Sequence, residues 1–171
     1  AKGVEEKTLL TLSEIIEQEL PQDKCVCAFG PSQCRRGWKR TSDYLCGKFS
    51  PERDSRISAG NLYEPVFRVY TTPDMLGVEL GAALKNVIAL AAGTADGLGY
   101  GDNTKAALIT RGIAEISRLG VKMGARMETF YGLSGIGDLI VTCASVHSRN
   151  RKAGYLMGKG YTMEQAMAEV K

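Results

Sequence analysis

The stretch Glu79-Leu-Gly-Ala-Ala-Leu-Lys85-Asn86-Val-Ile-Ala-Leu-Ala-Ala-Gly93 decides how the rest of the chain is interpreted. Small and apolar residues fill almost all of it, and its length and composition predict a helix. A helix that is apolar on nearly every face is normally buried. A lysine in such a helix is costly unless its ammonium group is paired or its side chain is neutral. Lys85 is therefore the first candidate for a functional residue.

Composition limits the class of protein to which the chain can belong. Its 171 residues suffice for one sizeable domain or for pieces of two. Hydrophobic residues make up 44% and charged residues 24%, as in soluble globular proteins. A net charge of +3 is too small to indicate nucleic acid, and polar residues interrupt the most apolar run, so no membrane partner is expected. The five cysteines lack paired spacing, which favours reduced cytoplasmic thiols over disulfides or a zinc site.

Periodicity divides the chain into two parts. The first predicted elements are a helix over 8–20, capped by Thr8, and strands over 25–29 and 66–70. Over 74–171 every predicted element is helical, and glycine-rich segments connect the helices. The pattern therefore indicates the last part of an α/β unit followed by an all-helical region.

The stretch 33–60 has a different character from its surroundings. It holds seven Lys and Arg residues against three acidic residues, a net charge of +4, and it contains the only Trp. No sustained period of either kind runs through it, so no regular element is predicted there. It is a basic arm for nucleic acid, a linker, or a stretch that is not native sequence.

Eight segments match, in order, the motifs of one family. They are Ala1–Gly3, Gly30–Ser32, Phe67–Tyr70, Gly77–Ala89, Gly97–Asn103, Leu108–Gly112, Gly135–Leu139 and Ser148–Arg151. Each motif alone is weak, but all eight in register are specific. The chain resembles the bacterial NAD(P)-dependent glycerol-3-phosphate dehydrogenases over essentially its whole length outside 33–60.

The resemblance implies a mostly α fold in two parts. Residues 1–72 would be the tail end of a Rossmann-type dinucleotide-binding domain, and 73–171 a helical substrate-binding domain truncated at its C-terminus. The fingerprint G-x-G-x-x-G, which such a domain uses to bind the cofactor pyrophosphate, is not in the sequence. The chain is therefore expected to be a middle fragment that is inactive alone, from a cytoplasmic enzyme that uses NAD or NADP and that is able to form a homodimer.

A frameshift is our hypothesis for the aberrant stretch. Where the family continues with a helix that opens like His-Ala-Glu-Glu-Val-Gly, this chain has Gln33-Cys-Arg-Arg-Gly-Trp-Lys-Arg40. One choice of codons for Cys34 to Arg40, read one base later, encodes Ala-Glu-Glu-Val-Gly-Lys. A choice for Arg56 to Gly60, shifted the same way, encodes Glu-Tyr-Leu-Gln. A compensated frameshift would explain the basic residues of 33–60 without assigning them any function.

Lys85 is the predicted proton acceptor. Oxidation of a secondary alcohol to a ketone needs a hydride acceptor, which the cofactor supplies, and a base for the hydroxyl proton. Burial in an apolar helix disfavours the charged form of a lysine and suits it to this role. The resemblance places the proton acceptor at Lys85. The alternative is a lysine whose ammonium group reaches out to the helix surface.

Asn86 and Asp138 are predicted to bind substrate near Lys85. The amide of Asn86 suits a hydrogen bond to a substrate hydroxyl or to a neighbouring loop. Asp138 ends the predicted turn Gly135-Ile-Gly-Asp138, and the resemblance makes it a substrate ligand; the alternative is a helix N-cap. Thr142 would lie on the same helical face one turn later and is a weaker candidate.

A phosphate site is predicted at Ser148, Arg149 and Asn150. A hydroxyl, a guanidinium and an amide at a helix start suit a phosphate group, because the backbone N–H groups and the helix dipole also attract it. The alternative is an ordinary capped surface helix. The resemblance implies that these three residues bind glycerol phosphate and that Arg149 also contacts the cofactor.

Three residues near the start of the chain complete the predicted site. The resemblance implies that Lys2, Gly30 and Ser32 contact substrate, and that Lys2 also contacts the cofactor. No metal site is expected, because His147, the only histidine, has no ligand partners at suitable spacing. Arg151 is interpreted as a surface charge.

The expected activity is the interconversion of sn-glycerol 3-phosphate and dihydroxyacetone phosphate, which supplies glycerol phosphate for phospholipid synthesis. One alternative is another two-domain NAD(P)-dependent dehydrogenase of a different hydroxy substrate. A second is a non-catalytic helical binding module with a basic arm.

Overall fold

A computed structural model of the chain describes residues 3–19, 26–29, 43–49 and 67–170. Helices dominate this part of the chain, as predicted. The elements, in order, are α1 (Leu12–Glu19), β1 (Val26–Phe29), β2 (Asp43–Phe49), β3 (Phe67–Thr71), α3 (Met75–Gly97), α4 (Asp102–Lys122), α5 (Met127–Phe130), the π-helical turn η2 (Leu133–Gly137), α6 (Asp138–Ala144), α7 (Arg149–Gly158) and α8 (Met163–Glu169).

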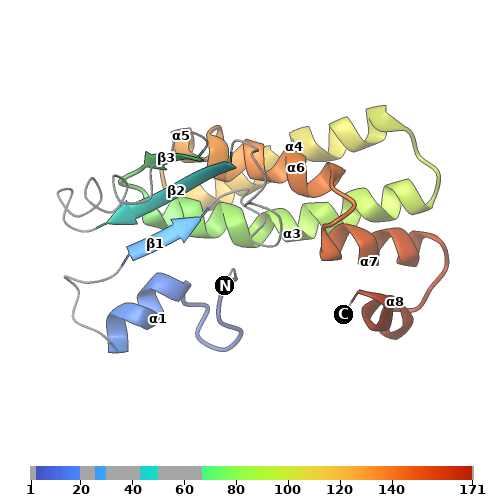
Figure 1. Ribbon diagram of the computed structural model, residues 1–171, viewed down its shortest axis with the longest axis horizontal. Coiled ribbons are helices and arrows are strands. Elements are labelled where there is room, and N and C mark those ends of the chain that lie inside the picture. The colour runs from blue at the N-terminus through green and yellow to red at the C-terminus, as the bar shows by residue number, and fades with distance from the viewer. Residues whose placement is uncertain (1–2, 20–25, 30–42, 50–66, 171) are drawn as a thin grey trace.

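The long helix α3 forms the axis of the molecule (Figure 1). The sheet and α1 lie near the end at which α3 begins. α4 runs back antiparallel to α3, α6 lies on the same side as α4, and α7 packs along the other side of α3. α3 is thus in contact with helices from most of the chain, and its residues are placed to join them into one core.

α3 begins directly after Pro73 and Asp74. The Asp74 carboxylate accepts a hydrogen bond from the Gly77 backbone N–H at 2.9 Å, which caps the helix. The same carboxylate accepts bonds from the Arg126 backbone N–H at 2.8 Å and from the Thr129 hydroxyl at 2.5 Å. One buried side chain therefore joins the start of α3 to the start of α5.

One apolar cluster surrounds α3. Its buried members are Leu80, Ala89, Ala92, Ile113, Ile116, Ala125, Phe130, Leu139 and Cys143. The Phe130 ring lies against Gly120 of α4, where an added Cβ would lie 2.1 Å from a ring carbon. The small residues of α3 allow its neighbours to approach closely, which explains why so few large side chains suffice for this core.

By length and composition α3 is long and apolar enough to cross a membrane, contrary to the expectation from its polar residues. Half of its most apolar window is buried inside the protein. Glu79 and Lys85 are themselves buried, and both have charged or polar partners on other elements. These contacts are those of the core helix of a folded domain.

α3 and α7 pack backbone to backbone through glycines. A Cβ on Gly93 would lie 2.0 Å from the Arg151 carbonyl oxygen, and one on Gly154 would lie 2.0 Å from a carbonyl oxygen of α3. Gly97 and Gly158 meet one turn later, where a Cβ on Gly158 would lie 2.9 Å from the Gly97 Cα. Both helices advance in the same direction through these contacts, so α7 runs parallel to α3.

The described strands form one small sheet in the order β1-β2-β3. β1 pairs with β2 antiparallel, with Val26 opposite Phe49, and β2 pairs with β3 in parallel, with Asp43 opposite Phe67. The strands predicted over 25–29 and 66–70 are therefore found. The expectation of no regular element within 33–60 is wrong for β2, because this strand is held by backbone pairing on both sides rather than by its own periodicity.

The first helix begins later than predicted. Thr8 does not cap it: the Thr8 hydroxyl and backbone N–H both donate to the Glu5 carboxylate, at 2.7 and 2.6 Å, in a turn that precedes the helix. Leu9 has a positive φ of 59°, which interrupts any continuous helix. α1 then starts after Thr11, whose carbonyl accepts from the Ile15 N–H at 3.1 Å.

Candidate active site

Lys85 lies in the middle of α3 and is only 5% exposed. Asp138, the first residue of α6, is 3% exposed. The Lys85 ammonium and the Asp138 carboxylate form an ion pair between the two helices. Lys85 is thus a buried, paired lysine, and the alternative in which it reaches the helix surface is wrong.

Thr142 links the two charged groups. The Lys85 Nζ donates to the Thr142 hydroxyl oxygen at 2.9 Å, and the Thr142 hydroxyl donates to the Asp138 carbonyl oxygen at 2.5 Å. Its Oγ1 also lies 3.5 Å from the Asp138 Oδ1. The prediction that Thr142 and Asp138 share a helical face is therefore confirmed, and the weaker candidate lies in the same cluster as the two stronger ones.

A wide helical turn places Asp138. The predicted turn over 135–138 is instead the π-helical turn η2, which passes directly into α6. An added Cβ at Gly135 would lie 2.1 Å from the Phe130 carbonyl oxygen, so only glycine fits there. The N-cap of α6 is Gly137, and no side chain caps the helix. The N-cap alternative for Asp138 is wrong, because its carboxylate faces Lys85 instead of its own backbone.

The environment of Lys85 contains two opposed effects. Burial disfavours a charged ammonium, whereas the Asp138 carboxylate favours it. A buried charge that lost its partner would be destabilising, so the two residues contribute to stability together. This arrangement suits a group that exchanges a proton with a bound ligand, because Asp138 and Thr142 stabilise an ammonium that forms on Lys85.

Asn86 is half-buried beside Lys85 on α3. Its Nδ2 donates to the Ala82 carbonyl oxygen on the preceding turn, at 3.4 Å. This is a long bond within the helix, so the structure does not show Asn86 holding a neighbouring loop. The amide is left as a candidate for contact with a ligand.

The predicted phosphate residues lie at the start of α7. Ser148 is the N-cap, and its Oγ accepts from the Arg151 backbone N–H at 3.3 Å. Arg149 and Asn150 are exposed. Only residues 145–148 separate α6 from α7, and the first turn of α7 packs against the C-terminal half of α3, where Gly93 lies beside Arg151. The predicted helix start is confirmed, and the phosphate role of the three residues stays a prediction.

Arg151 is not the surface charge that the sequence suggests. Its side chain is 16% exposed, and its Nη2 lies 2.5 Å from the Asp96 Oδ2 of α3. Lys105 of α4 lies 2.9 Å from the other oxygen of the same carboxylate. Burial raises the pKa of Asp96, but the hydrogen bonds and charges of Lys105 and Arg151 outweigh it and hold that pKa below its usual value. Sequence reasoning missed this cluster because its members come from three separate helices.

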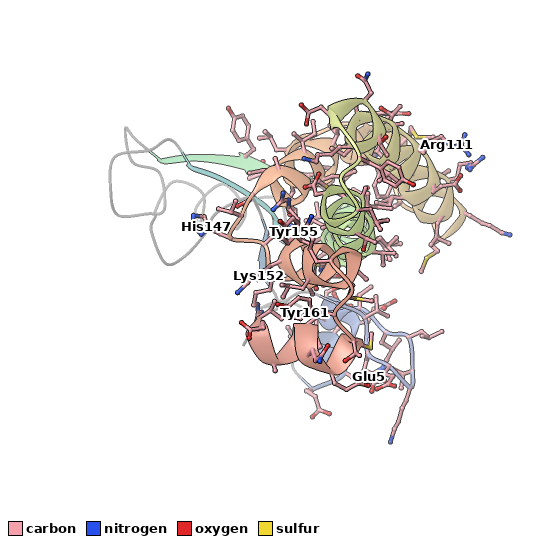
Figure 2. The ribbon with its side chains drawn as sticks, turned by 90° about the vertical axis from the view of Figure 1, so that its right-hand side faces the viewer. Glu5, Arg111, His147, Lys152, Tyr155 and Tyr161 are labelled. Atoms are coloured by element: carbon pink, nitrogen blue, oxygen red, sulfur yellow. The ribbon has the colours of Figure 1, made fainter. Side chains whose placement is uncertain are left out.

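Several predicted residues lie outside the described part of the chain. Lys2, Gly30 and Ser32 are among them, as is most of 33–60. His147 is exposed at the surface (Figure 2), as predicted. Within the described ranges no group of three or more His, Cys, Asp or Glu side chains is arranged to hold a metal ion.

Comparison with known proteins places the chain in a family. Residues 74–171, more than half of the chain, match the family model for the C-terminus of NAD-dependent glycerol-3-phosphate dehydrogenase. The chain belongs to the NAD-dependent glycerol-3-phosphate dehydrogenase family. The resemblance found in the sequence motifs is thereby confirmed, and the family implies NAD or NADP as cofactor.

Curated bacterial members of the family match the whole chain. It is 57% identical over 171 residues to the glycerol-3-phosphate dehydrogenase (NAD(P)+) of Agathobacter rectalis, covering 100% of this chain and 51% of that protein. It is 53% identical over 173 residues to the Bacillus subtilis enzyme of the same name, covering 99% and 50%. The chain therefore spans about half the length of the curated relatives it matches.

Solved structures of family members share the fold. The crystal structure of glycerol-3-phosphate dehydrogenase from Coxiella burnetii superposes with a TM-score of 0.93 at 37% identity, over 99% of this chain and 52% of that chain. The Saccharomyces cerevisiae enzyme gives a TM-score of 0.88 at 30% identity, over 98% and 51%. The predicted mostly helical fold is confirmed.

Proposed function

We propose that this chain supplies the substrate-binding part of an NAD(P)-dependent dehydrogenase that interconverts sn-glycerol 3-phosphate and dihydroxyacetone phosphate. The observation that carries the proposal is the buried contact of Lys85 with Asp138 and Thr142 at the centre of a helical domain of this family. Ionisable groups that are buried together are frequent at catalytic sites.

Lys85 acts as the proton acceptor in this proposal. When the substrate alcohol is oxidised, its C2 hydroxyl proton passes to the neutral Lys85 Nζ while the C2 hydride leaves as the carbonyl forms. The bound NAD(P)+ supplies the chemistry of hydride acceptance. Asp138 and Thr142 stabilise the ammonium produced on Lys85, which lowers the barrier to proton transfer. In the reverse direction the same ammonium returns the proton to the ketone oxygen.

The phosphate group of the substrate is held at the start of α7. Ser148, Arg149 and Asn150 combine backbone N–H groups, a positive helix end and an exposed guanidinium, which together favour a dianion. Asn86, next to Lys85, would bind the substrate hydroxyl. Substrate binding thereby places C2 beside the lysine and the phosphate away from it.

The residues near the start of the chain complete the substrate and cofactor contacts in this proposal. Lys2, Gly30 and Ser32 would bind substrate from the dinucleotide-binding side. The exposed guanidinium of Arg149 fits one anionic end of a dinucleotide, and Lys2 would contact the cofactor beside it. The chain holds no G-x-G-x-x-G sequence, so the rest of the cofactor would be bound by other residues.

The wider setting follows from the same proposal. Residues 1–72 belong to a dinucleotide-binding domain and 73–171 to the substrate domain, with 33–60 altered by a compensated frameshift. The enzyme works in the cytoplasm on small molecules, without a nucleic-acid or membrane partner, as a monomer or homodimer, and it supplies glycerol phosphate for phospholipid synthesis. Sequencing the coding DNA across 33–60 tests the frameshift.

The decisive experiment compares variants of the full-length protein that contains this chain. The wild type should oxidise glycerol 3-phosphate with NAD+ or NADP+, and Lys85→Met should lower kcat by a factor of about 10² to 10⁴. Lys122→Met is the matched control, because Lys122 is exposed at the end of α4. A Lys85→Met enzyme with unchanged kcat would refute the role of Lys85, and equal turnover of a hydroxy substrate without phosphate would refute the proposed substrate.

A further inference from the structure

Glu79 is a buried carboxylate that the proposed chemistry does not use. It lies on α3 and is 3% exposed. Its Oε1 accepts a hydrogen bond from the Ser13 backbone N–H at 2.9 Å, and its Oε2 accepts one from the Ser13 hydroxyl. Glutamate is almost never fully buried unless it is paired, so this double contact explains why Glu79 is tolerated inside the protein.

The contact caps the second residue of α1. Ser13 is the second residue of α1, and the first N–H groups of a helix have no acceptor within it. Glu79 supplies that acceptor from another helix, and its charge lies at the positive end of α1. Ser13 is 5% exposed and Thr11 2% exposed, with 3.1 Å between their hydroxyl oxygens. Three buried polar side chains thus form one connected set between α1 and α3.

The anchored residues also hold the segment that precedes α1. Thr11 forms a β-bridge with Val4, and the Glu5 backbone N–H donates to the Leu10 carbonyl oxygen at 2.9 Å. The chain from 4 to 11 is therefore a closed loop, and Glu5 lies on it beside α1 (Figure 2). Because the loop closes at Thr11, fixing Thr11 and Ser13 also fixes the start of the described chain.

The other end of the contact is close to the catalytic lysine. Glu79 precedes Lys85 by six residues on one continuous helix, which is about 9 Å along the helix axis. A helix transmits position over such a length, because its backbone is rigid. Glu79 thus connects the helix that carries Lys85 to the segment that follows Lys2 in the sequence.

We propose that Glu79 is a positioning residue for the dehydrogenase reaction. By binding Ser13, Glu79 holds the segment before α1 against α3. Residues of the dinucleotide-binding domain then contact the substrate at a defined distance from Lys85. This role rests on the proposed function. Glu79 itself touches neither substrate nor cofactor; it acts through Ser13 and α1.

The test uses the full-length protein with Glu79→Ala, Glu79→Gln, Ser13→Ala and the double variant Ser13→Ala/Glu79→Ala. Glu79→Ala should raise KM for the dinucleotide and for glycerol 3-phosphate by about tenfold and lower kcat. Glu79→Gln should restore both constants to within about twofold of the wild type, because an amide can accept from the N–H and donate to the hydroxyl. Glu17→Ala, at an exposed position of α1, is the matched control and should leave both constants unchanged.

The double variant tests whether Glu79 acts through Ser13. Its kinetic constants should be no worse than those of Glu79→Ala alone, because the two side chains contribute through one contact. Additive losses in the double variant would overturn the proposal. So would a Glu79→Ala enzyme with a lower Tm whose KM values stay within about twofold of the wild type, since this is the result of a purely structural role.

The two proposals fail in different ways. If the wild-type protein does not oxidise glycerol 3-phosphate, the proposed function has failed and the positioning role fails with it. If the wild type is active, Lys85→Met is inactive and Glu79→Ala is indistinguishable from the control, only the positioning role is overturned.

Discussion

Lys85 of α3 and Asp138 of α6 form an ion pair in which both residues are at least nineteen-twentieths buried, at 5% and 3% exposure. Thr142 accepts a hydrogen bond from the lysine and donates one to the Asp138 backbone. The pair joins the central helix to the helix that follows η2. Removing either member would take away the charged partner of the other inside the protein.

Replacing one member of this pair should cost more than replacing both. Asp138→Asn removes the charge opposite a buried ammonium, and we expect the free energy of unfolding to fall by about 3–5 kcal/mol. The double variant Lys85→Met/Asp138→Leu removes both charges and should be clearly more stable than Asp138→Asn. Urea denaturation of the full-length protein at neutral pH measures both.

An exposed ion pair provides the control for this prediction. Arg111 and Glu115 pair on the surface of α4, and Arg111 points away from α3 (Figure 2). Glu115→Gln should change the free energy of unfolding by less than about 1 kcal/mol, because water screens such pairs. A double variant of Lys85 and Asp138 less stable than Asp138→Asn would contradict the expected dependence of the two charges on each other.

The glycine contact between α3 and α7 should not tolerate a side chain. A Cβ on Gly93 would lie 2.0 Å from the Arg151 carbonyl oxygen, a backbone atom that cannot move without its helix. Gly93→Ala should therefore destabilise the protein by about 3 kcal/mol or more, despite the better helix propensity of alanine. Thermal or urea unfolding measures the change.

Gly101→Ala is the matched control for the glycine contact. Gly101 has a φ of −81°, which alanine adopts readily, and no atom lies within 4 Å of an added Cβ. This substitution should change stability by less than about 0.5 kcal/mol. Equal effects of the two substitutions would show that α3 and α7 do not pack through Gly93.

Asp96 should make the stability depend on pH in the acid range. The pKa of Asp96 is lower in the folded protein than in the unfolded chain, because Lys105 and Arg151 outweigh the effect of burial. Its contribution is therefore complete above the unfolded value, about 4, and is lost as the pH falls through the lower folded value. The difference in stability between wild type and Asp96→Asn should shrink as the pH falls below about 4.

Unfolding curves from neutral pH down to the acid range measure this difference. Asp102→Asn is the control. Asp102 is fully exposed, and its carboxylate comes no closer than 4.0 Å to the Lys105 Nζ. The control should differ little from wild type at any pH. A difference between wild type and Asp96→Asn that grows toward acid pH would reverse the expected sign.

The Cys143 thiol should be unreactive in the folded protein. Cys143 is fully buried, and burial raises the pKa of its thiol to about 11. Because the thiolate is the reactive form, iodoacetamide at mildly alkaline pH should modify Cys143 only after denaturation. Mass spectrometry of the Cys143 peptide measures the extent of modification. Val146→Cys is the control: this position is 71% exposed, so its thiol should react in the native state. Modification of native Cys143 as fast as of Val146→Cys would contradict its burial.

The 171-residue chain alone should have no nicotinamide-dependent turnover. No G-x-G-x-x-G sequence is present to place a dinucleotide pyrophosphate at a helix start. Lys85 would then have no hydride acceptor beside its substrate. Absorbance of the reduced cofactor with purified chain and glycerol 3-phosphate measures this, with the full-length protein as the positive control. Measurable turnover by the chain alone would show that the cofactor is bound without that fingerprint.

The amino-acid sequence by itself determined which segments are helical and which lysine is unusual. Small and apolar residues around Lys85 predict a buried helix because burial is the only way to remove such a surface from water. Local sequence also suffices for the entry at Asp74, the cap at Ser148 and the capping box at Thr162, since these hydrogen bonds join residues three apart.

Only the tertiary structure decided which distant residues meet. Three contacts join separate elements of the fold. They are the ion pair of Lys85 with Asp138, the ion pair of Arg151 with Asp96, and the hydrogen bonds of Ser13 to Glu79. No local pattern specifies such contacts, because they depend on how closely the helices approach. Here that approach is set by glycines such as Gly93, whose missing side chains let two backbones touch.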